Sequence, residues 1–355
     1  MSANLRSGGP RLHRGIGLIE VMIGIVIAML LVLVIYQIYE ISESQKRTIT
    51  SGSDAQQNAS YGVFVLGRDI SMAGNGIASA AAGLDTCALL RPIPVLIDAG
   101  AGPNDPDTVT VLYGGSSSLS TRVPFRGSAT TADAYVVPGP IGFSPNDVIA
   151  AVQAPPGTRC TVSTVNAAAG SVVVNPANGE ATLQHTPVAA LAGNDLGANY
   201  VAGDSLVNLG QAAAIGRIAY TVDTIGHVLR TQNLLPTAGP VNPVINDVVN
   251  LKAQYGLDTD NDGAIDAWQD ATAGVWTSAN LPTQPLATLR QIRAVRIAIV
   301  TRSAQYEKDP VTTAPLAMFD GAGAVSMPIA GDDQHYRYKV LETIVPLRNA
   351  LWNGS

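Results

Sequence analysis

The densest group of residues that could do chemistry is an acidic run from 258 to 266, with the sequence DTDNDGAID. Counted from its first residue, the carboxylates at positions 1, 3, 5 and 9 are Asp258, Asp260, Asp262 and Asp266. Position 6 is glycine, and Ala264 at position 7 offers a backbone carbonyl. EF-hand-type loops place their oxygen ligands for Ca²⁺ in this order. The pattern therefore predicts a calcium-binding loop.

The end of this loop departs from the EF-hand pattern. Position 12 is Gln269, where an EF-hand has a bidentate glutamate. The flanking residues indicate strand and loop, not paired helices. We therefore expect a weak site, with a dissociation constant on the order of 10⁻⁴–10⁻³ M as in extracellular modules, unless Asp270 or a remote residue completes the shell. The alternative is an exposed polar turn, in which Asp-Gly only supplies turn geometry.

Glu20 is the second residue whose setting points to a function. It stands near the start of an apolar run from Ile16 to Tyr39. An ionisable group in lipid is costly and is a functional candidate by default. Cleavage between Gly15 and Ile16 would place a positive α-amino group one helical turn from the Glu20 carboxylate, or against the same carboxylate of a neighbouring subunit. Either pairing would offset the cost of the charge.

The apolar run itself predicts a single membrane span. About 24 residues of helix extend roughly 36 Å at 1.5 Å per residue. The three arginines of the first fifteen residues predict that this end stays in the cytoplasm and that the rest of the chain lies outside it. No small-x-small cleavage site follows the run, so a secretory signal peptide fits poorly. An ordinary single-span anchor with an accidental glutamate is the alternative.

The start of the run, Arg14-Gly15-Ile16-Gly17-Leu18-Ile19-Glu20, resembles the processing motif of type IV prepilins. The resemblance implies that a prepilin peptidase removes residues 1–15 and methylates the new N-terminus at Ile16. It also implies that Glu20 guides docking onto other pilins, major and minor. The implied location is the bacterial inner membrane, with the head outside the cytoplasm, and then an extracellular pilus. Ile16 and Gly17 depart from the Phe and Thr that are commoner there.

The remaining chain divides into a helical continuation and a β-rich head. Apolar residues at 59, 63, 66 and 70, followed by Gly74 at a C-cap position, predict further helix. We expect a leader at 1–15, a transmembrane helix at 16–39, its continuation at 40–75 and a head at 76–355. The Gly/Ala/Pro-rich stretches near 98–106 and 175–203 are interpreted as loops. Short β-branched segments predict strands at 107–113, 160–166, 171–174, 205–209, 215–222, 227–231, 294–302 and 336–345.

Three later segments, 249–268, 293–303 and 336–353, look like the C-terminal part of PilW-type minor pilins. With the N-terminus they imply an α+β, pilin-like fold, in which the long N-terminal hydrophobic helix packs on an antiparallel sheet. The implied function is that of a minor type IV pilin, a structural subunit that takes part in pilus assembly or filament priming. Two alternatives stay open: a minor pseudopilin of a type II secretion system, and a membrane-anchored surface adhesin.

Composition limits the other functions. The formal charge is -6, and removal of the leader with its three arginines leaves 18 basic against 27 acidic residues, or -9. This charge argues against a nucleic-acid surface. The four histidines lack metal-ligand spacing and no nucleophile–base motif is present, so we expect no enzyme. Cys87 and Cys160, the only cysteines, are expected to form a disulfide outside the cytoplasm; two unpaired buried thiols are the alternative.

Overall fold

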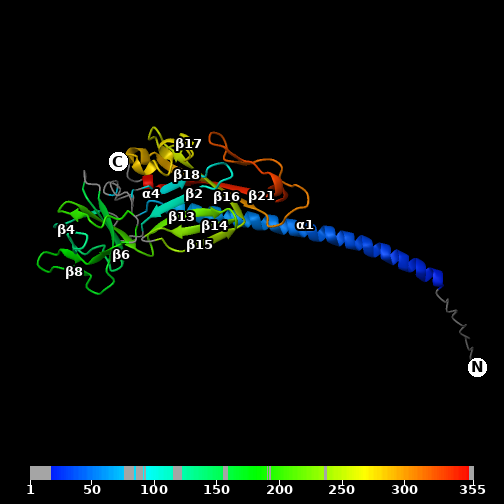
Figure 1. Ribbon diagram of the computed structural model, residues 1–355, viewed down its shortest axis with the longest axis horizontal. Coiled ribbons are helices and arrows are strands. Elements are labelled where there is room, and N and C mark those ends of the chain that lie inside the picture. The colour runs from blue at the N-terminus through cyan, green and yellow to red at the C-terminus, as the bar shows by residue number, and fades with distance from the viewer. Residues whose placement is uncertain are drawn as a thin grey trace, which may run out of the picture. The chain divides into compact units, whose positions relative to one another are not determined.

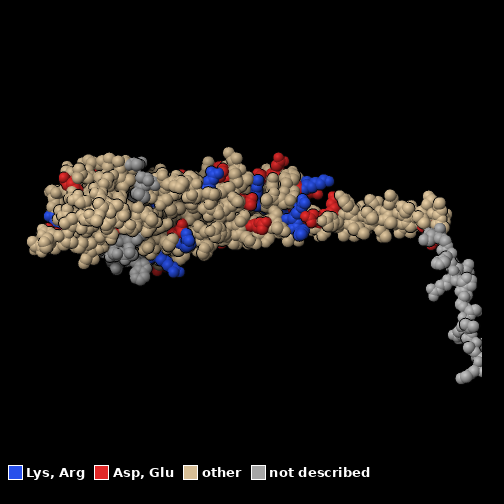
Figure 2. Space-filling view, turned by 90° about the horizontal axis from the view of Figure 1, so that it is seen from below, with Lys and Arg blue, Asp and Glu red and all other residues tan. Residues whose placement is uncertain are grey.

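The computed structural model describes residues 17–75, 84, 91, 93–114, 122–154, 159–189, 191, 193–235 and 238–351. It divides the chain into two compact units, residues 1–51 and 52–355. The helix α1 (Leu18–Met72) begins in the first unit and ends in the second. From Leu18 to Ile41 every large apolar side chain is exposed, and Figure 2 shows this stretch almost free of charged side chains on the drawn face. By length and composition this part of α1 is able to cross a membrane.

In the second unit, α1 packs on β-sheets through a face of small and aliphatic residues. The buried residues of this face are Ala55, Ala59, Gly62, Leu66 and Ile70. A Cβ atom on Gly62 would lie 2.8 Å from Ile245 Cδ1 and 2.9 Å from Ile299 Cδ1. Glycine at this position therefore lets the helix approach both side chains closely.

The helix ends where the sequence places a cap. Gly74 has a φ of 78°, the left-handed conformation that glycine adopts most readily after a helix. Asn349 Nδ2 donates hydrogen bonds to the carbonyl oxygens of Met72 and Ala73, at 3.3 Å and 3.2 Å. A residue near the end of the chain thus satisfies carbonyl groups that the helix leaves open.

Two antiparallel sheets pack against the buried face of this part of α1. The first has the strand order β1 (Val95–Asp98), β2 (Thr108–Tyr113), β13 (Gly216–Asp223), β14 (Val228–Asn233) and β15 (Val241–Asn246). The second has the order β17 (Ala267–Gln269), β16 (Val248–Leu257), β18 (Ile292–Arg302) and β21 (Tyr338–Pro346). Leu66 and Ile70 of α1 share one buried core with residues of both sheets. Figure 1 shows these strands beside the second half of the helix.

Residues 122–211 form a further group of strands, inserted between the neighbouring strands β2 and β13. One of its cores contains only residues of this group, and the other also includes Leu112 of β2 and Ile215. Its main sheet has the order β10 (His185–Pro187), β7 (Cys160–Val165), β6 (Asp147–Val152), β12 (Ser205–Gln211) and β3 (Arg122–Pro124). Beside it lie β5 (Tyr135–Val137), β9 (Ala181–Leu183) and β8 (Val172–Val174), and the pair β4 (Ala129–Thr130) and β11 (Asn199–Tyr200). Figure 1 shows β4, β6 and β8 together at one end of the second unit, and Figure 2 shows few charged side chains there on the drawn face.

Short elements complete the C-terminal half. They are the 3₁₀ turns η2 (Gly274–Trp276), η3 (Leu281–Thr283) and η4 (Gly331–His335), the helices α3 (Leu286–Leu289) and α4 (Arg348–Leu351), and the hairpin of β19 (Leu316–Met318) and β20 (Val325–Met327). The architecture is α+β, with a long N-terminal helix packed on antiparallel sheets, as the sequence predicted.

Candidate metal centre

The acidic run is the connection of a β-hairpin. β16 and β17 pair at Tyr255–Leu257 with Ala267–Gln269, so the nine residues 258–266 lie between paired strands and not between helices. The backbone is left-handed at Asn261, with a φ of 64°, and at Gly263, with a φ of 91°. Asparagine and glycine are the residue types that adopt this conformation most easily.

Backbone N–H groups of the loop hold its carboxylates. Gly263 N donates to Asp258 Oδ2 at 3.1 Å, and Asp262 N donates to Asp260 Oδ1 at 3.1 Å. Ala264 N donates to Asp262 Oδ1 at 2.7 Å. Each of these three carboxylates is therefore oriented by the loop itself, as in Asx turns.

Three of the four predicted carboxylates come together. Asp258, Asp260 and Asp262 each offer one oxygen atom, and these atoms lie within 4.8 Å of one another. Asp260 and Asp262 are exposed, whereas Asp258 is fully buried. Asp258 Oδ1 is buried and has no hydrogen-bond partner among the described residues. A buried carboxylate oxygen without a partner costs free energy that a bound cation would offset.

The predicted ligand Asp266 takes a different position from these three. Its Oδ2 accepts hydrogen bonds from Thr259 N and Thr259 Oγ1, both at 2.7 Å. These bonds, the side-chain one first, lower the pKa of Asp266. Asp266 N also donates to the carbonyl oxygen of Leu257 at 2.8 Å. Asp266 thus closes the loop, with its carboxylate held by Thr259.

Arg293 is the residue of this site that sequence reasoning missed. Its Nε donates to Asp258 Oδ2 at 2.9 Å from the second position of β18. The Arg293 side chain is 18% exposed and that of Asp258 is 0% exposed. The two residues are far apart in sequence, and nothing in the sequence of β18, which also contains Arg296 and Arg302, distinguishes Arg293 as the partner of Asp258. The pair gives the buried carboxylate one partner inside the protein.

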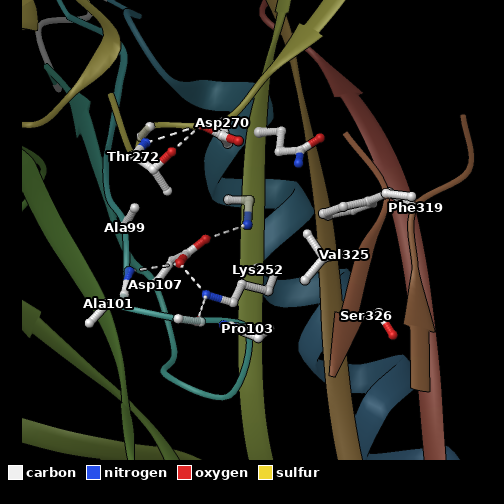
Figure 3. A pocket seen from close by; sticks show the side chains of 16 residues that line it. Ala99, Ala101, Pro103, Asp107, Lys252, Asp270, Thr272, Phe319, Val325 and Ser326 are labelled. Atoms are coloured by element: carbon white, nitrogen blue, oxygen red, sulfur yellow. Dashed lines mark hydrogen bonds and ion pairs between the residues drawn. The ribbon is translucent and has the colours of Figure 1, made fainter. Parts of the chain in front are cut away.

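A cavity of about 340 Å³ lies beside β16 and is lined in part by the residues that follow β17. Figure 3 shows Asp270 and Thr272 at one end of it and Asp107 with Lys252 along its wall. Asp270 Oδ1 accepts hydrogen bonds from Thr272 N and Thr272 Oγ1, at 3.2 Å and 2.5 Å. Asp270 therefore lines this cavity and is not part of the three-carboxylate cluster.

The cavity wall contains a buried ion pair. Lys252 Nζ lies 2.9 Å from Asp107 Oδ1 and donates to the carbonyl oxygens of Gly102 and Asp105, at 2.9 Å and 2.6 Å. Asp107 Oδ2 accepts a hydrogen bond from Ala253 N at 2.9 Å. All three donors of the ammonium group are used, so the pair fastens the segment before β2 to β16 and leaves no donor of Lys252 for a ligand.

The other predicted site residues are placed as follows. Glu20 is exposed in the first turn of α1, where its N–H donates to the carbonyl oxygen of Gly17 at 3.0 Å. Gly15, Ile16 and Cys87 lie outside the described residues. Cys160 begins β7 with 6% of its surface exposed, and no free cysteine occurs in the described part of the chain. The Cys87–Cys160 pairing stays a prediction.

Comparisons with known proteins add a family. Residues 219–349 match the PilW family, described as Type IV Pilus-assembly protein W, and this range contains both the acidic loop and Arg293. A solved structure, the type IV-like pilin TTHA1219 from Thermus thermophilus, aligns at 14% identity with a TM-score of 0.26, over 58% of this chain and 86% of that chain. The comparison with curated proteins gave no match. Residues 219–349 of the chain are therefore similar to the PilW family, and the long N-terminal helix packed on antiparallel sheets fits the fold that the sequence predicted.

Proposed function

We propose that this chain is a minor type IV pilin, a structural subunit without catalytic activity that takes part in pilus assembly or filament priming. The family match supports a role in type IV pilus assembly. The observation that carries the finer proposal is the first part of α1, whose large apolar side chains are exposed from Leu18 to Ile41 and whose first turn holds Glu20. Such a helix needs lipid or neighbouring helices around it.

Glu20 has a specific task in this proposal. A prepilin peptidase in the bacterial inner membrane removes residues 1–15, and the α-amino group of Ile16 becomes the new N-terminus. The Glu20 carboxylate then pairs with the terminal amine of a neighbouring pilin when the helix enters the filament. Because an unpaired carboxylate is costly in an apolar bundle, this pairing favours one axial position of the subunit over others.

The test compares two glutamates of the same helix. Glu20→Gln removes the charge inside the apolar stretch, and Glu40→Gln makes the same change at its polar end. We expect both variants to be processed and inserted, while Glu20→Gln falls by about tenfold or more in sheared pili, since breaking a buried pair costs about 3–5 kcal/mol. The measurements are the mass of the mature protein and quantitative blotting of sheared filaments.

Wild-type amounts of Glu20→Gln in pili would contradict the role of Glu20. A retained leader would instead favour a generic anchor, as in an adhesin.

We propose further that the acidic loop binds one Ca²⁺. Asp258, Asp260 and Asp262 supply carboxylate oxygens, Ala264 supplies its carbonyl oxygen, and Asp266 contributes directly or through water. The unpartnered, buried Asp258 Oδ1 supports this proposal, because a polar turn without a cation leaves that oxygen unsatisfied. Mg²⁺ should replace Ca²⁺ poorly, since it demands a tighter octahedral shell.

The calcium proposal is tested by the melting temperature of the detergent-solubilised protein. Calcium at ten times the dissociation constant should add about 1.4 kcal/mol to the free energy of unfolding, and a chelator should reverse the gain. The double variant Asp260→Asn/Asp262→Asn should lose it. The matched control, Asp309→Asn/Asp332→Asn, removes two exposed carboxylates outside the loop and should keep it. An unchanged melting temperature at millimolar calcium, with no heat of binding in calorimetry, would show that the loop is only a polar turn.

A further inference from the structure

The two oxygens of Asp258 have different surroundings. Oδ2 accepts hydrogen bonds from Gly263 N at 3.1 Å and from Arg293 Nε at 2.9 Å, whereas Oδ1 has no partner among the described residues. We propose that Arg293 is a resident counter-ion that shares Asp258 with the metal: the guanidinium group holds Oδ2 and a calcium ion binds Oδ1. The inference rests on the calcium site proposed above and concerns the regulation of its affinity.

The position of Arg293 is set by the sheet and not by the loop. β16 and β18 are antiparallel, and their register shifts between the pairs Gly256–Ala294 and Leu257–Ile292. Arg293 is the unpaired residue at this irregularity, and its Nε reaches Asp258 Oδ2 at 2.9 Å. Asp258 N also donates to the carbonyl oxygen of Gln291 at 2.8 Å. The guanidinium group is therefore beside Asp258 whether or not a metal ion is bound.

This arrangement has a consequence for the protein without calcium. A fully buried carboxylate with no counter-ion strongly destabilises the folded state. Arg293 supplies that counter-ion from inside the chain, and the Gly263 N–H adds a second donor to the same oxygen. The loop therefore keeps its buried anchor when calcium is absent, and the head depends only weakly on calcium for its stability.

Arg293 also weakens calcium binding. Its positive charge and the ion are attracted to one carboxylate and repel each other across it, in a partly buried setting where charges interact more strongly than in water. Removal of the guanidinium group leaves the Gly263 N–H to orient Oδ2, so the loss of orientation is small compared with the repulsion that is relieved. Without Arg293, calcium becomes the main counter-ion of Asp258.

The experiment measures calcium binding and melting of the full-length protein in detergent. Arg293→Gln removes the charge, Arg293→Lys keeps it, and Arg290→Gln is the control that removes an exposed arginine three residues earlier. For Arg293→Gln we expect a Kd for CaCl₂ lower by about tenfold or more, a lower melting temperature in chelator and a larger rise with calcium. Arg293→Lys and Arg290→Gln should bind within about threefold of the wild type.

Each outcome bears on the inference. An unchanged or weaker affinity of Arg293→Gln, in a wild type that binds calcium, overturns the role of Arg293 and leaves the calcium site intact. No binding by the wild type overturns both the site and this inference, while the pilin proposal is tested separately by Glu20. If Arg293→Gln folds only in calcium, the inference is supported. If Arg293→Gln folds neither with calcium nor with chelator, the affinity of Arg293→Lys is the test. A tenfold tighter calcium affinity in that variant would show that the charge of Arg293 does not weaken calcium binding.

Discussion

The Tyr220 hydroxyl donates a hydrogen bond to Asp69 Oδ2 at 2.6 Å, which joins the middle strand of the first sheet to α1 inside the core. Both residues are buried. Asp69 Oδ1 accepts a second bond from Arg68 Nη2 at 3.0 Å, so the carboxylate has a charged partner at the surface. Burial, and then the hydrogen bond to Asp69, raise the pKa of Tyr220, which keeps the hydroxyl a donor.

Tyr220→Phe tests this link between helix and sheet. The change removes one donor and leaves Asp69 Oδ2 buried, so the free energy of unfolding should fall by about 1–3 kcal/mol. Urea unfolding followed by circular dichroism measures the loss. Tyr61→Phe is the control, because Tyr61 lies on α1 with 55% of its surface exposed and should change the midpoint little. Equal midpoints for the two variants would show that the buried bond contributes nothing.

The Asp107–Lys252 pair predicts a larger loss. Lys252→Met leaves Asp107 buried without its cation, which should cost about 3–5 kcal/mol in denaturant unfolding. The more exposed pair of Arg126 and Glu180, at 3.7 Å, is the comparison, and Arg126→Met should cost under about 1 kcal/mol. In Asp107→Asn/Lys252→Met the unpaired charge is gone, so part of the stability should return. A double variant no more stable than Lys252→Met would contradict the electrostatic explanation.

The cysteines give a third prediction. A disulfide between Cys87 and Cys160 closes a loop of about 70 residues, which on the chain-entropy model stabilises the fold by roughly 4 kcal/mol. Thiol titration of the denatured, unreduced protein should therefore find no free thiol, and reduction should lower the melting temperature. Two titrated thiols before reduction would rule the disulfide out.

The long, β-branched segments were predicted well because their residues alone favour extended structure. The segments 215–222 and 227–231 correspond to the hairpin β13–β14, and 294–302 lies within β18. The interpretation of 175–203 as loop was wrong in part, since β9, β10 and β11 lie there. These strands have two or three residues each, too few for a period of two to show, and they are extended because partners such as β5, β7 and β4 pair with them.

The candidate metal site, like the fold, was predicted from the sequence only in part. Asp258, Asp260 and Asp262 could be found from the sequence, because the loop that gathers them is local and its spacing is read directly. Arg293 could not, because only the register of β16 with β18 brings it to Asp258. The burial of Asp258, on which the calcium proposal depends, is likewise a property of the packed sheet.

His185 predicts a pH dependence of stability. Its ring stacks on Tyr135 with centroids 3.7 Å apart, and its Nε2 lies 2.8 Å from the carbonyl oxygen of Asp133 and donates to it. Its Nδ1 is buried with no hydrogen-bond partner in the described part of the chain, so the protonated ring would carry an unsatisfied N–H. Burial lowers the pKa of His185, and the bond to Asp133 opposes this only in part.

Because the pKa of His185 is lower in the folded than in the unfolded chain, the unfolded chain binds the proton more readily as the pH falls. The contribution of His185 to the free energy of unfolding is therefore complete above about pH 6.5, the ordinary pKa of histidine. It is lost as the pH falls toward the pKa of the folded state, with a slope of at most about 1.4 kcal/mol per pH unit.

We expect the free energy of unfolding in urea to decrease from pH 7.5 to pH 5, and less so in His185→Phe, which keeps a ring on Tyr135 but cannot titrate. His227→Asn provides the comparison, since burial also lowers the pKa of His227 and asparagine tolerates its positive φ of 51°. The two variants should each remove a separate part of the decrease. An identical decrease in the wild type and His185→Phe would show that another group causes it.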